Sequence, residues 1–419
     1  MRCAVTHTLL LTSLMGLFLL PRPGLASSPD PRPIELEQAV EWALHDPALE
    51  QEQRATSDVF LGAADQQSGW PNPTLEWERD ALFGTPVDRE DSLVVEQTIP
   101  LSGRHRHLAD ALRATAEARR WEVVDDQRQL AHQVQQHFYD LLATQDQLDA
   151  INESVDQLQR TLSIMERRVD AGESPPYALE RLRLAATDLR STRSEYDAQR
   201  QFHQQRLQAL FDHPDAPDTP ESIVAEGPLA PDSVPDAEYL DQALEDHPLQ
   251  EAHRAHQRAA EAESKAAQSG WRPDLYLQAG LLHQRDQQDS RRGWIGGIGI
   301  DLPLFDRLQG DRLTADATSR ARASSHHLQF RQMDSEARAQ WRRAQTLCQS
   351  AQDYAEEAFP RSDQILDLAQ RSYDAGEIAL SDLLDAHDEY RGARLRRTDL
   401  QSQCRQTLLE LRFLIADED

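Results

Sequence analysis

The sequence predicts an α+β protein that is mostly α-helical, with long antiparallel coiled-coil helices, four β-strands and an internal duplication. Three observations lead to this class. Residues 104–171 contain neither proline nor glycine, which allows one helix of roughly 100 Å. Residues 92–99 alternate apolar and polar side chains, as a strand with two different faces does. Four short motifs of the first half recur, in the same order, in the second half.

The N-terminus predicts a secretory signal peptide over residues 1–26. Arg2 supplies positive charge, an apolar stretch follows from Leu9 to Leu20, and Gly24 and Ala26 are small residues at a cleavage site. The apolar stretch is too short for a membrane-spanning helix. The alternative interpretation is an N-terminal membrane anchor. No cysteine stands directly after the cleavage site, so we expect no lipid anchor.

Composition argues against thick globular cores. Only 39% of the residues are hydrophobic, 28% are charged and the net charge is −28. Narrow helical seams need less apolar material than a globule does. The excess of acid disfavours nucleic acid and anionic membrane surfaces as partners and suits the attraction or passage of cations, although acidic solvated faces are also common. After the signal peptide no apolar run approaches the ~20 residues of a membrane helix, so membrane contact would have to use strands.

The first repeat is predicted to span residues 27–211. It begins with a proline-rich leader and two helices separated at Asp46 and Pro47. A β-hairpin follows at about 74–99, then a long helix over 104–172 and a returning helix over 177–210. The long helix keeps a heptad rhythm typical of a coiled-coil seam. The residues of this seam are Leu141, Leu148, Ile151, Val155, Leu158, Leu162, Met165 and Val169.

The second repeat is predicted to span residues 236–416, after a linker over 212–235 that is rich in proline and aspartate. Its hairpin lies at about 274–302, its long helix over 308–375 with a kink at Pro360, and its returning helix over 379–414. The repeated motifs are ALHDPAL and ALEDHPL, SGWPNPTL and SGWRPDL, IPLSGR and LPLFDR, and DAGE in both halves. Gly172 and Gly376 of the two DAGE motifs mark the helix-hairpin tips.

Four strands of roughly nine residues are long enough to cross a membrane when tilted, but they cannot close a barrel. Open edges are not tolerated in lipid, so the chain must oligomerise if its strands span a bilayer. Two chains would give eight strands and three would give twelve. Trp77, Tyr276 and Trp294 could contribute to an aromatic belt, or they could simply pack. The class is therefore an α+β membrane protein.

Several segments together resemble a known family. They are SGWPNPTLEWE, the VEQTIPLSGRHR turn into the long helix, the two DAGE tips, and SYDAGEIALSDLLDAHDEY at residues 372–390. In their order and duplication they resemble the TolC family of outer-membrane efflux proteins, and within it the CzcC-like outer-membrane components of heavy-metal RND efflux systems. The resemblance covers nearly all of the chain after the signal peptide.

The resemblance implies a homotrimer with a twelve-stranded β-barrel in the outer membrane of a Gram-negative bacterium, above a helical periplasmic tunnel. It implies an inner-membrane RND pump and a periplasmic adaptor as partners. It also implies a periplasmic gate of aspartate rings, which maps to Asp382 and Asp385. The alternative for these two residues is a solvated acidic helix face. The corresponding positions of the first repeat hold Ala178 and Arg181, so a gate built from both halves is in doubt.

Cys348 and Cys404 each lie 28 residues from Gly376, on opposite sides of the tip. Equal distances from a turn place two residues opposite each other on antiparallel helices, which allows a disulfide in an oxidising compartment. If the turn is a few residues away from Gly376, the two cysteines are too far apart to bond. His253 with His256, and His326 with His327, are pairs for which no completing ligand is evident. We identify no catalytic, cofactor-binding or metal-binding constellation and expect neither an enzyme nor a bound cofactor.

The resulting hypothesis is a passive exit duct for divalent heavy-metal cations that an RND pump delivers through the adaptor. A TolC-type duct for drugs or other small molecules is the alternative within the family. A soluble periplasmic coiled-coil scaffold is the alternative from another class, and it would show no channel activity. A secreted enzyme would need a pocket that the sequence does not indicate.

Overall fold

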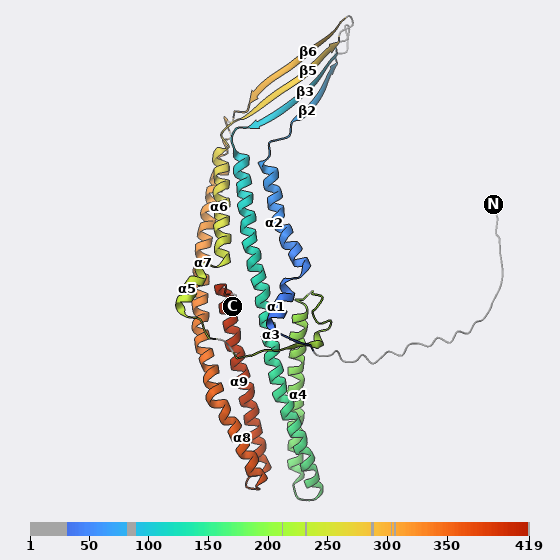
Figure 1. Cartoon of the computed structure of the whole chain (residues 1–419), viewed down its shortest axis with the longest axis vertical. Helices are drawn as coiled ribbons and strands as arrows, with labels where there is room; N and C mark the ends of the chain where they lie inside the picture. The colour runs from blue at the N-terminus through green and yellow to red at the C-terminus, as the bar shows by residue number, and fades with distance from the viewer. Residues whose placement is uncertain are drawn as a thin grey trace, which may run out of the picture.

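The chain folds into an elongated molecule with a β-sheet at one end and two helical hairpin tips at the other (Figure 1). The computed structural model describes residues 32–81, 89–211, 213–230, 233–285, 289–302, 304–305 and 307–417. The predicted signal peptide lies outside the described residues. Within the described ranges, no helix combines the length and the apolar character that crossing a membrane requires.

The first repeat closely follows the expected order of elements. The elements are β1 (Arg32–Ile34), α1 (Leu36–Leu44), α2 (Pro47–Ser68), β2 (Thr74–Ala81), β3 (Arg89–Pro100), α3 (Arg104–Asp170) and α4 (Pro176–Gln208). Asp46 caps α2, because its carboxylate accepts hydrogen bonds from the backbone N–H groups of Ala48 and Leu49. Gly103 precedes α3 with a φ of 67°, a left-handed conformation that glycine adopts without steric cost.

The second repeat has the same plan with one interruption. The linker holds a 3-10 turn (Pro220–Ser222) and β4 (Ile223–Ala225). The repeat itself consists of α5 (Ala237–Glu245), α6 (Pro248–Ser269), β5 (Asp274–Arg285), β6 (Ser290–Ile300), α7 (Gln309–Asp353), α8 (Phe359–Asp374) and α9 (Leu380–Ile415). The expected helix over 308–375 is not one α-helix, because a π-helical turn at Tyr354–Ala358 separates α7 from α8. Pro360 lies in the first turn of α8, where its missing N–H costs least, and the π-turn accommodates the break just before it.

The four long strands form one antiparallel sheet in the order β2-β3-β5-β6. Pairing of β3 with β5 joins the two repeats, with Val95 opposite Ala279 and Leu93 opposite Leu281. At Gly280 a Cβ atom would lie 2.5 Å from the carbonyl oxygen of Leu93, so glycine permits this close pairing. Within the described chain, β2 and β6 are the sheet's edges and pair on one side only.

A small parallel sheet at mid-height joins the N-terminal leader to the linker between the repeats. Strand β1 pairs with β4, so that the two segments lie side by side. Side-chain amides complete this sheet: Gln145 of α3 donates to the carbonyl of Ala225 and accepts from its N–H, each at 3.0 Å. Gln204 of α4 donates to the carbonyl of Ile223 at 2.7 Å. The linker is therefore anchored on the helical body.

The core is a set of narrow seams, most of them along α3, which packs against α1, α2, α4, α6 and α9; a further seam lies between α5, α7 and α9. The heptad positions Leu141, Leu148, Ile151, Val155 and Met165 are buried, as a coiled-coil seam requires. The remaining three heptad positions are partly buried against the same clusters. The long helices are therefore held by a stripe of apolar contacts rather than by a globular core.

Candidate functional site: the two-faced sheet and the helix tips

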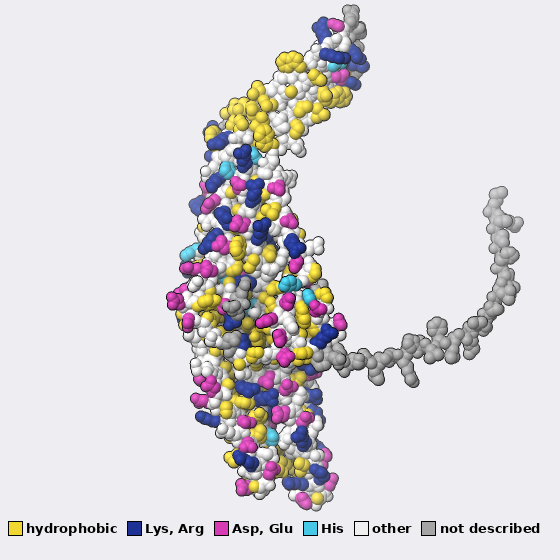
Figure 2. All heavy atoms as spheres, viewed as in Figure 1, with side chains coloured by type: hydrophobic (Ala, Val, Ile, Leu, Met, Phe, Trp, Pro, Cys, Tyr) yellow, Lys and Arg dark blue, Asp and Glu magenta, His cyan; other side chains and the backbone are white. Residues whose placement is uncertain are grey.

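The sheet presents one apolar face whose side chains are exposed in the single chain. Adjacent strands place Trp77, Leu93, Leu281 and Trp294 in one row. Trp294 is 82% exposed and Trp77 is 61% exposed, which is unusual for large apolar side chains outside a contact surface. Other exposed apolar residues of this face are Leu75, Val95, Leu277, Ile298 and Ile300. Figure 2 shows hydrophobic side chains gathered over the sheet, in contrast to the mixed charges of the helical body.

The opposite face of the sheet is polar and acidic near β2 and β3. Glu76, Glu78 and Glu96 alternate with the apolar residues of the first face. Gln278 of β5 donates a hydrogen bond to the Glu96 carboxylate, which links the two repeats on this face. Tyr276 also belongs to this face and donates to Asp301. Of the two interpretations left open for the three aromatic residues, a shared belt therefore does not include Tyr276.

Both helix tips end in a Schellman motif around the predicted glycines. Gly172 has a φ of 77° and Gly376 a φ of 75°, the left-handed conformation that this motif needs. At the first tip the N–H of Glu173 donates to the carbonyl of Arg168 at 2.8 Å, and at the second the N–H of Glu377 donates to the carbonyl of Ser372 at 2.8 Å. The same pattern of backbone hydrogen bonds thus turns the chain at both helix tips.

Asp382 and Asp385 lie on one exposed face in the first turns of α9. Asp382 also has a local task, because its carboxylate accepts a hydrogen bond from the Ala379 N–H at 3.1 Å and so caps the helix. Asp385 lines a groove of about 560 Å³ between α9 and the α3–α4 hairpin. The first-repeat positions Ala178 and Arg181 line the same groove, so the two tips meet there.

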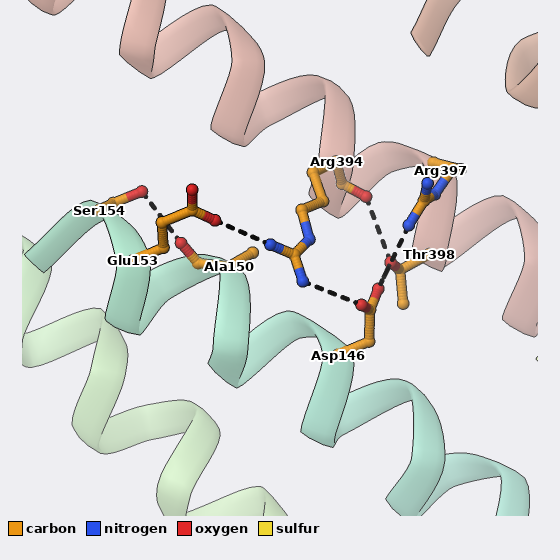
Figure 3. A network of polar contacts seen from close by, with 7 residues as sticks. All are labelled: Asp146, Ala150, Glu153, Ser154, Arg394, Arg397 and Thr398. Carbon is orange, nitrogen blue, oxygen red and sulfur yellow. Dashed lines mark hydrogen bonds and ion pairs between the residues drawn. The ribbon is translucent and has the colours of Figure 1, made fainter. Parts of the chain in front are cut away.

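A network of charged groups fastens α9 to α3 above the tips (Figure 3). Arg394 donates to Asp146 at 3.2 Å and to Glu153 at 3.0 Å, and only 20% of its side chain is exposed. Thr398 donates to the second oxygen of Asp146, and Arg397 lies 4.0 Å from that oxygen. Because α3 belongs to the first repeat and α9 to the second, the network sets the relative position of the two repeats.

Cys348 of α7 and Cys404 of α9 are joined by a disulfide, with 4.8 Å between their Cα atoms. Cys404 is fully buried in the apolar cluster between α5, α7 and α9. The bond therefore joins α7 to α9 within the second repeat.

The histidines noted in the sequence lie at the α6–α7 contact but do not form one group. The rings of His253 and His326 are 4.5 Å apart, whereas His256 faces Glu122 of α3 at 2.7 Å. Burial, together with the neighbouring His326, lowers the pKa of His253. Sequence reasoning missed a different set, His137 and Asp140 of α3 with His203 of α4, whose spacing about the Gly172 turn was the available signal.

A two-faced antiparallel sheet with open edges, continued by paired long helices, defines one protomer of an outer-membrane channel. Its similarity to known proteins agrees with this class. The chain belongs to the outer membrane efflux protein family, whose model matches residues 74–212 and 239–417. The predicted family and the predicted location in the outer membrane are thereby confirmed. The chain is also similar to the cobalt-zinc-cadmium resistance protein CzcC of Cupriavidus metallidurans, at 28% identity over 338 residues, 78% of this chain and 76% of that protein.

Solved structures show the same fold. A membrane protein from Pseudomonas aeruginosa matches with a TM-score of 0.75 at 18% identity, covering 91% of this chain and 90% of that one. The outer membrane protein VceC of Vibrio cholerae matches with a TM-score of 0.71 at 18% identity, covering 91% and 95%. CusC, described as forming a transmembrane channel, matches with a TM-score of 0.70 at 17% identity, covering 91% of each chain. The predicted fold class is confirmed at the level of the single chain.

Proposed function

We propose that three copies of this chain form the outer-membrane exit duct of a tripartite efflux system for divalent heavy-metal cations. The observation that carries the proposal is the sheet, with an apolar face, an acidic face and two open edges. Pairing β6 of one chain with β2 of the next would satisfy both edges, and three chains would close twelve strands. The apolar face would then contact lipid and the acidic face would line the duct.

The cation cargo is supported by charge and by the relative's name. The acidic face carries carboxylates where a cation would pass, and the whole chain has a net charge of −28. The relative CzcC is named for cobalt, zinc and cadmium resistance. An inner-membrane RND pump and a periplasmic adaptor would deliver the cation, since the duct has no energy source of its own.

Asp382 and Asp385 form the periplasmic gate in this proposal. In a threefold assembly each becomes a ring of three carboxylates, which favours cations and can constrict a pore. Both side chains are exposed in the single chain and project from one face of α9. The first tip supplies Arg181 instead of an acid, so the acidic rings come from the second repeat alone.

The gate is tested by conductance in planar bilayers. Asp382→Asn with Asp385→Asn removes both charges while the asparagine oxygen can still cap α9. We expect higher conductance and weaker cation selectivity. The control is Asp363→Asn with Asp367→Asn on α8, which removes the same charge from a neighbouring helix and should leave both quantities unchanged. Unaltered conductance and selectivity in the α9 variant would refute the gate assignment.

The cargo is tested by deletion of the gene and a panel of metals and drugs. Hypersensitivity to divalent metals, reversed by the intact chain, is the expected result. Sensitivity to organic compounds alone would replace the metal duct by a duct for drugs or other small molecules. A purified chain that stays a water-soluble monomer without channel activity would favour the scaffold instead.

A further inference from the structure

Three potential metal ligands meet at mid-height of the helical body, away from the sheet and from the tips. His137 and Asp140 are three residues apart on α3 and therefore share one face of that helix. His203 approaches them from the antiparallel helix α4. One ligand atom from each of the three residues lies within 4.8 Å of the other two, and no other such group of three exists in the part of the chain that the structure describes.

The hydrogen bonds around this cluster leave one ring nitrogen of each histidine without a partner. The Nδ1 atoms of His137 and His203 are buried and have no hydrogen-bond partner. Such orphaned nitrogens are costly unless something binds them. Nδ1 of His203 lies 3.8 Å from Oδ2 of Asp140, which is too long for a hydrogen bond. Two ligands that share one tetrahedral ion at ~2.0–2.1 Å lie ~3.3 Å apart, so a small side-chain adjustment would bring both atoms onto one ion.

The carboxylate is already oriented by a third helix. Gln406 of α9 donates to Oδ1 of Asp140 at 2.8 Å, which leaves Oδ2 directed toward His203. Outer hydrogen bonds of this kind fix the direction of a metal-binding carboxylate. The cluster therefore has both an inner set of ligands and a group that positions one of them.

The charge state of the rings suits a metal ion. Burial lowers the pKa of His203, and burial together with the neighbouring His203 ring lowers the pKa of His137. Both rings are therefore neutral near pH 7 and offer a lone pair. Burial raises the pKa of Asp140, and a bound cation would favour its ionised form. The positive charge of Arg206 nearby also lowers the pKa of His137.

We propose that His137, Asp140 and His203 bind one divalent transition-metal cation of the zinc class in each chain. Two imidazoles and a carboxylate are ligands that zinc accepts, and three protein ligands leave a fourth position for water. The half-buried position makes the site accessible from solvent. A bound ion would tie α3 to α4 directly and to α9 through Gln406. This site goes beyond the proposed duct, because it binds its ion in the wall of the helical body whatever cargo passes.

The test measures Zn²⁺ binding to the full-length protein in detergent by titration calorimetry. The intact chain should bind one Zn²⁺ per chain, and His203→Gln should bind at least ~100-fold more weakly. Gln406→Leu should bind ~10-fold more weakly, because it removes only the positioning group. His326→Gln is the matched control: it changes another half-buried histidine pair, which lacks a carboxylate ligand, and should bind as the intact chain does.

Thermal melting separates binding from folding. In EDTA the intact chain and His203→Gln should melt at the same temperature, and added Zn²⁺ should raise the midpoint of the intact chain only. Asp140→Asn, which keeps the Gln406 hydrogen bond, serves if His203→Gln does not fold. An intact chain that takes up no Zn²⁺ would overturn the proposal, as would a His326→Gln variant that loses as much affinity as His203→Gln. None of these readouts depends on transport, so failure of the duct would be distinguishable.

Discussion

The network between α3 and α9 allows a quantitative prediction for Arg394→Met. This change keeps most of the apolar stem and removes two charge-assisted hydrogen bonds, to Asp146 and to Glu153. Hydrogen bonds to charged groups contribute about 1.5–3 kcal/mol when buried. Because Glu153 is 66% exposed, we assign most of the effect to Asp146, whose side chain is 32% exposed. The free energy of opening α9 from α3 should fall by about 2 kcal/mol.

The assay is native-state hydrogen exchange, which reports local opening free energies. Amides of α9 near Arg394 should exchange ~30-fold faster in the variant, since about 1.4 kcal/mol corresponds to a factor of ten. Arg396→Met is the control on the same helix. Arg396 is 54% exposed, and among the described residues its ion pair is with Asp399 on its own helix, so exchange should change by less than ~3-fold. Equal acceleration in the two variants would refute the idea that the network fastens the repeats together.

Three further predictions concern His247, the disulfide and the glycine of the second tip. His247 is buried, and burial followed by the charge of Arg128 lowers its pKa to about 4. Because the unfolded chain takes up the proton near pH 6.5, the free energy of unfolding should fall by up to about 3 kcal/mol as the pH drops from about 6.5 to about 4. In pH-dependent melting, His247→Asn, which retains a cap acceptor, should not show this loss. The disulfide closes a loop of 56 residues, so Cys348→Ala with Cys404→Ala should lower the free energy of unfolding of the helical body, measured by denaturant unfolding, by up to about 4 kcal/mol. Two free thiols found by mass spectrometry in periplasm-derived protein would contradict the bond. Gly376→Ala should destabilise the second tip by about 1–2 kcal/mol because its φ is 75°, whereas Gly392→Ala, exposed within α9, should stabilise by about 0.5–1 kcal/mol; melting shifts of the same sign would disprove the assignment.

Long regular elements could be predicted from the sequence because their signals repeat many times. The absence of proline and glycine extends over all of α3, and its seam recurs at Leu148, Ile151 and Val155. The alternation in β3 likewise fixes which side chains share a face. A shift of the strand pairing by one residue would turn the apolar side chains to the opposite face of the sheet. The expected boundaries differ from the observed ones by one or two residues at most ends.

Short and long-range features could not be predicted in this way. Strands β1 and β4 have three residues each, too few for a period, and side-chain amides such as Gln145 complete their hydrogen bonding. The break before Pro360 was expected as a kink, but the π-turn that accommodates it has no sequence signature. The cluster of His137, Asp140 and His203 depends on the register of α3 against α4, which the sequence gives only approximately.

The distribution of exposed apolar residues indicates how the open edges would be satisfied. Helix α7 buries few residues, notably Ala337, Ala344 and Ala351, spaced by one heptad and packed toward α9 and α5. Its other side leaves Leu313 and Leu328 exposed, and α7 follows the open strand β6. At the other edge of the chain, α2 precedes the open strand β2. One side of the protomer thus combines β6 with α7 and the other combines α2 with β2. A neighbouring copy that pairs the strands would therefore also bring α2 against α7, so that closing the sheet and covering the helices become one event.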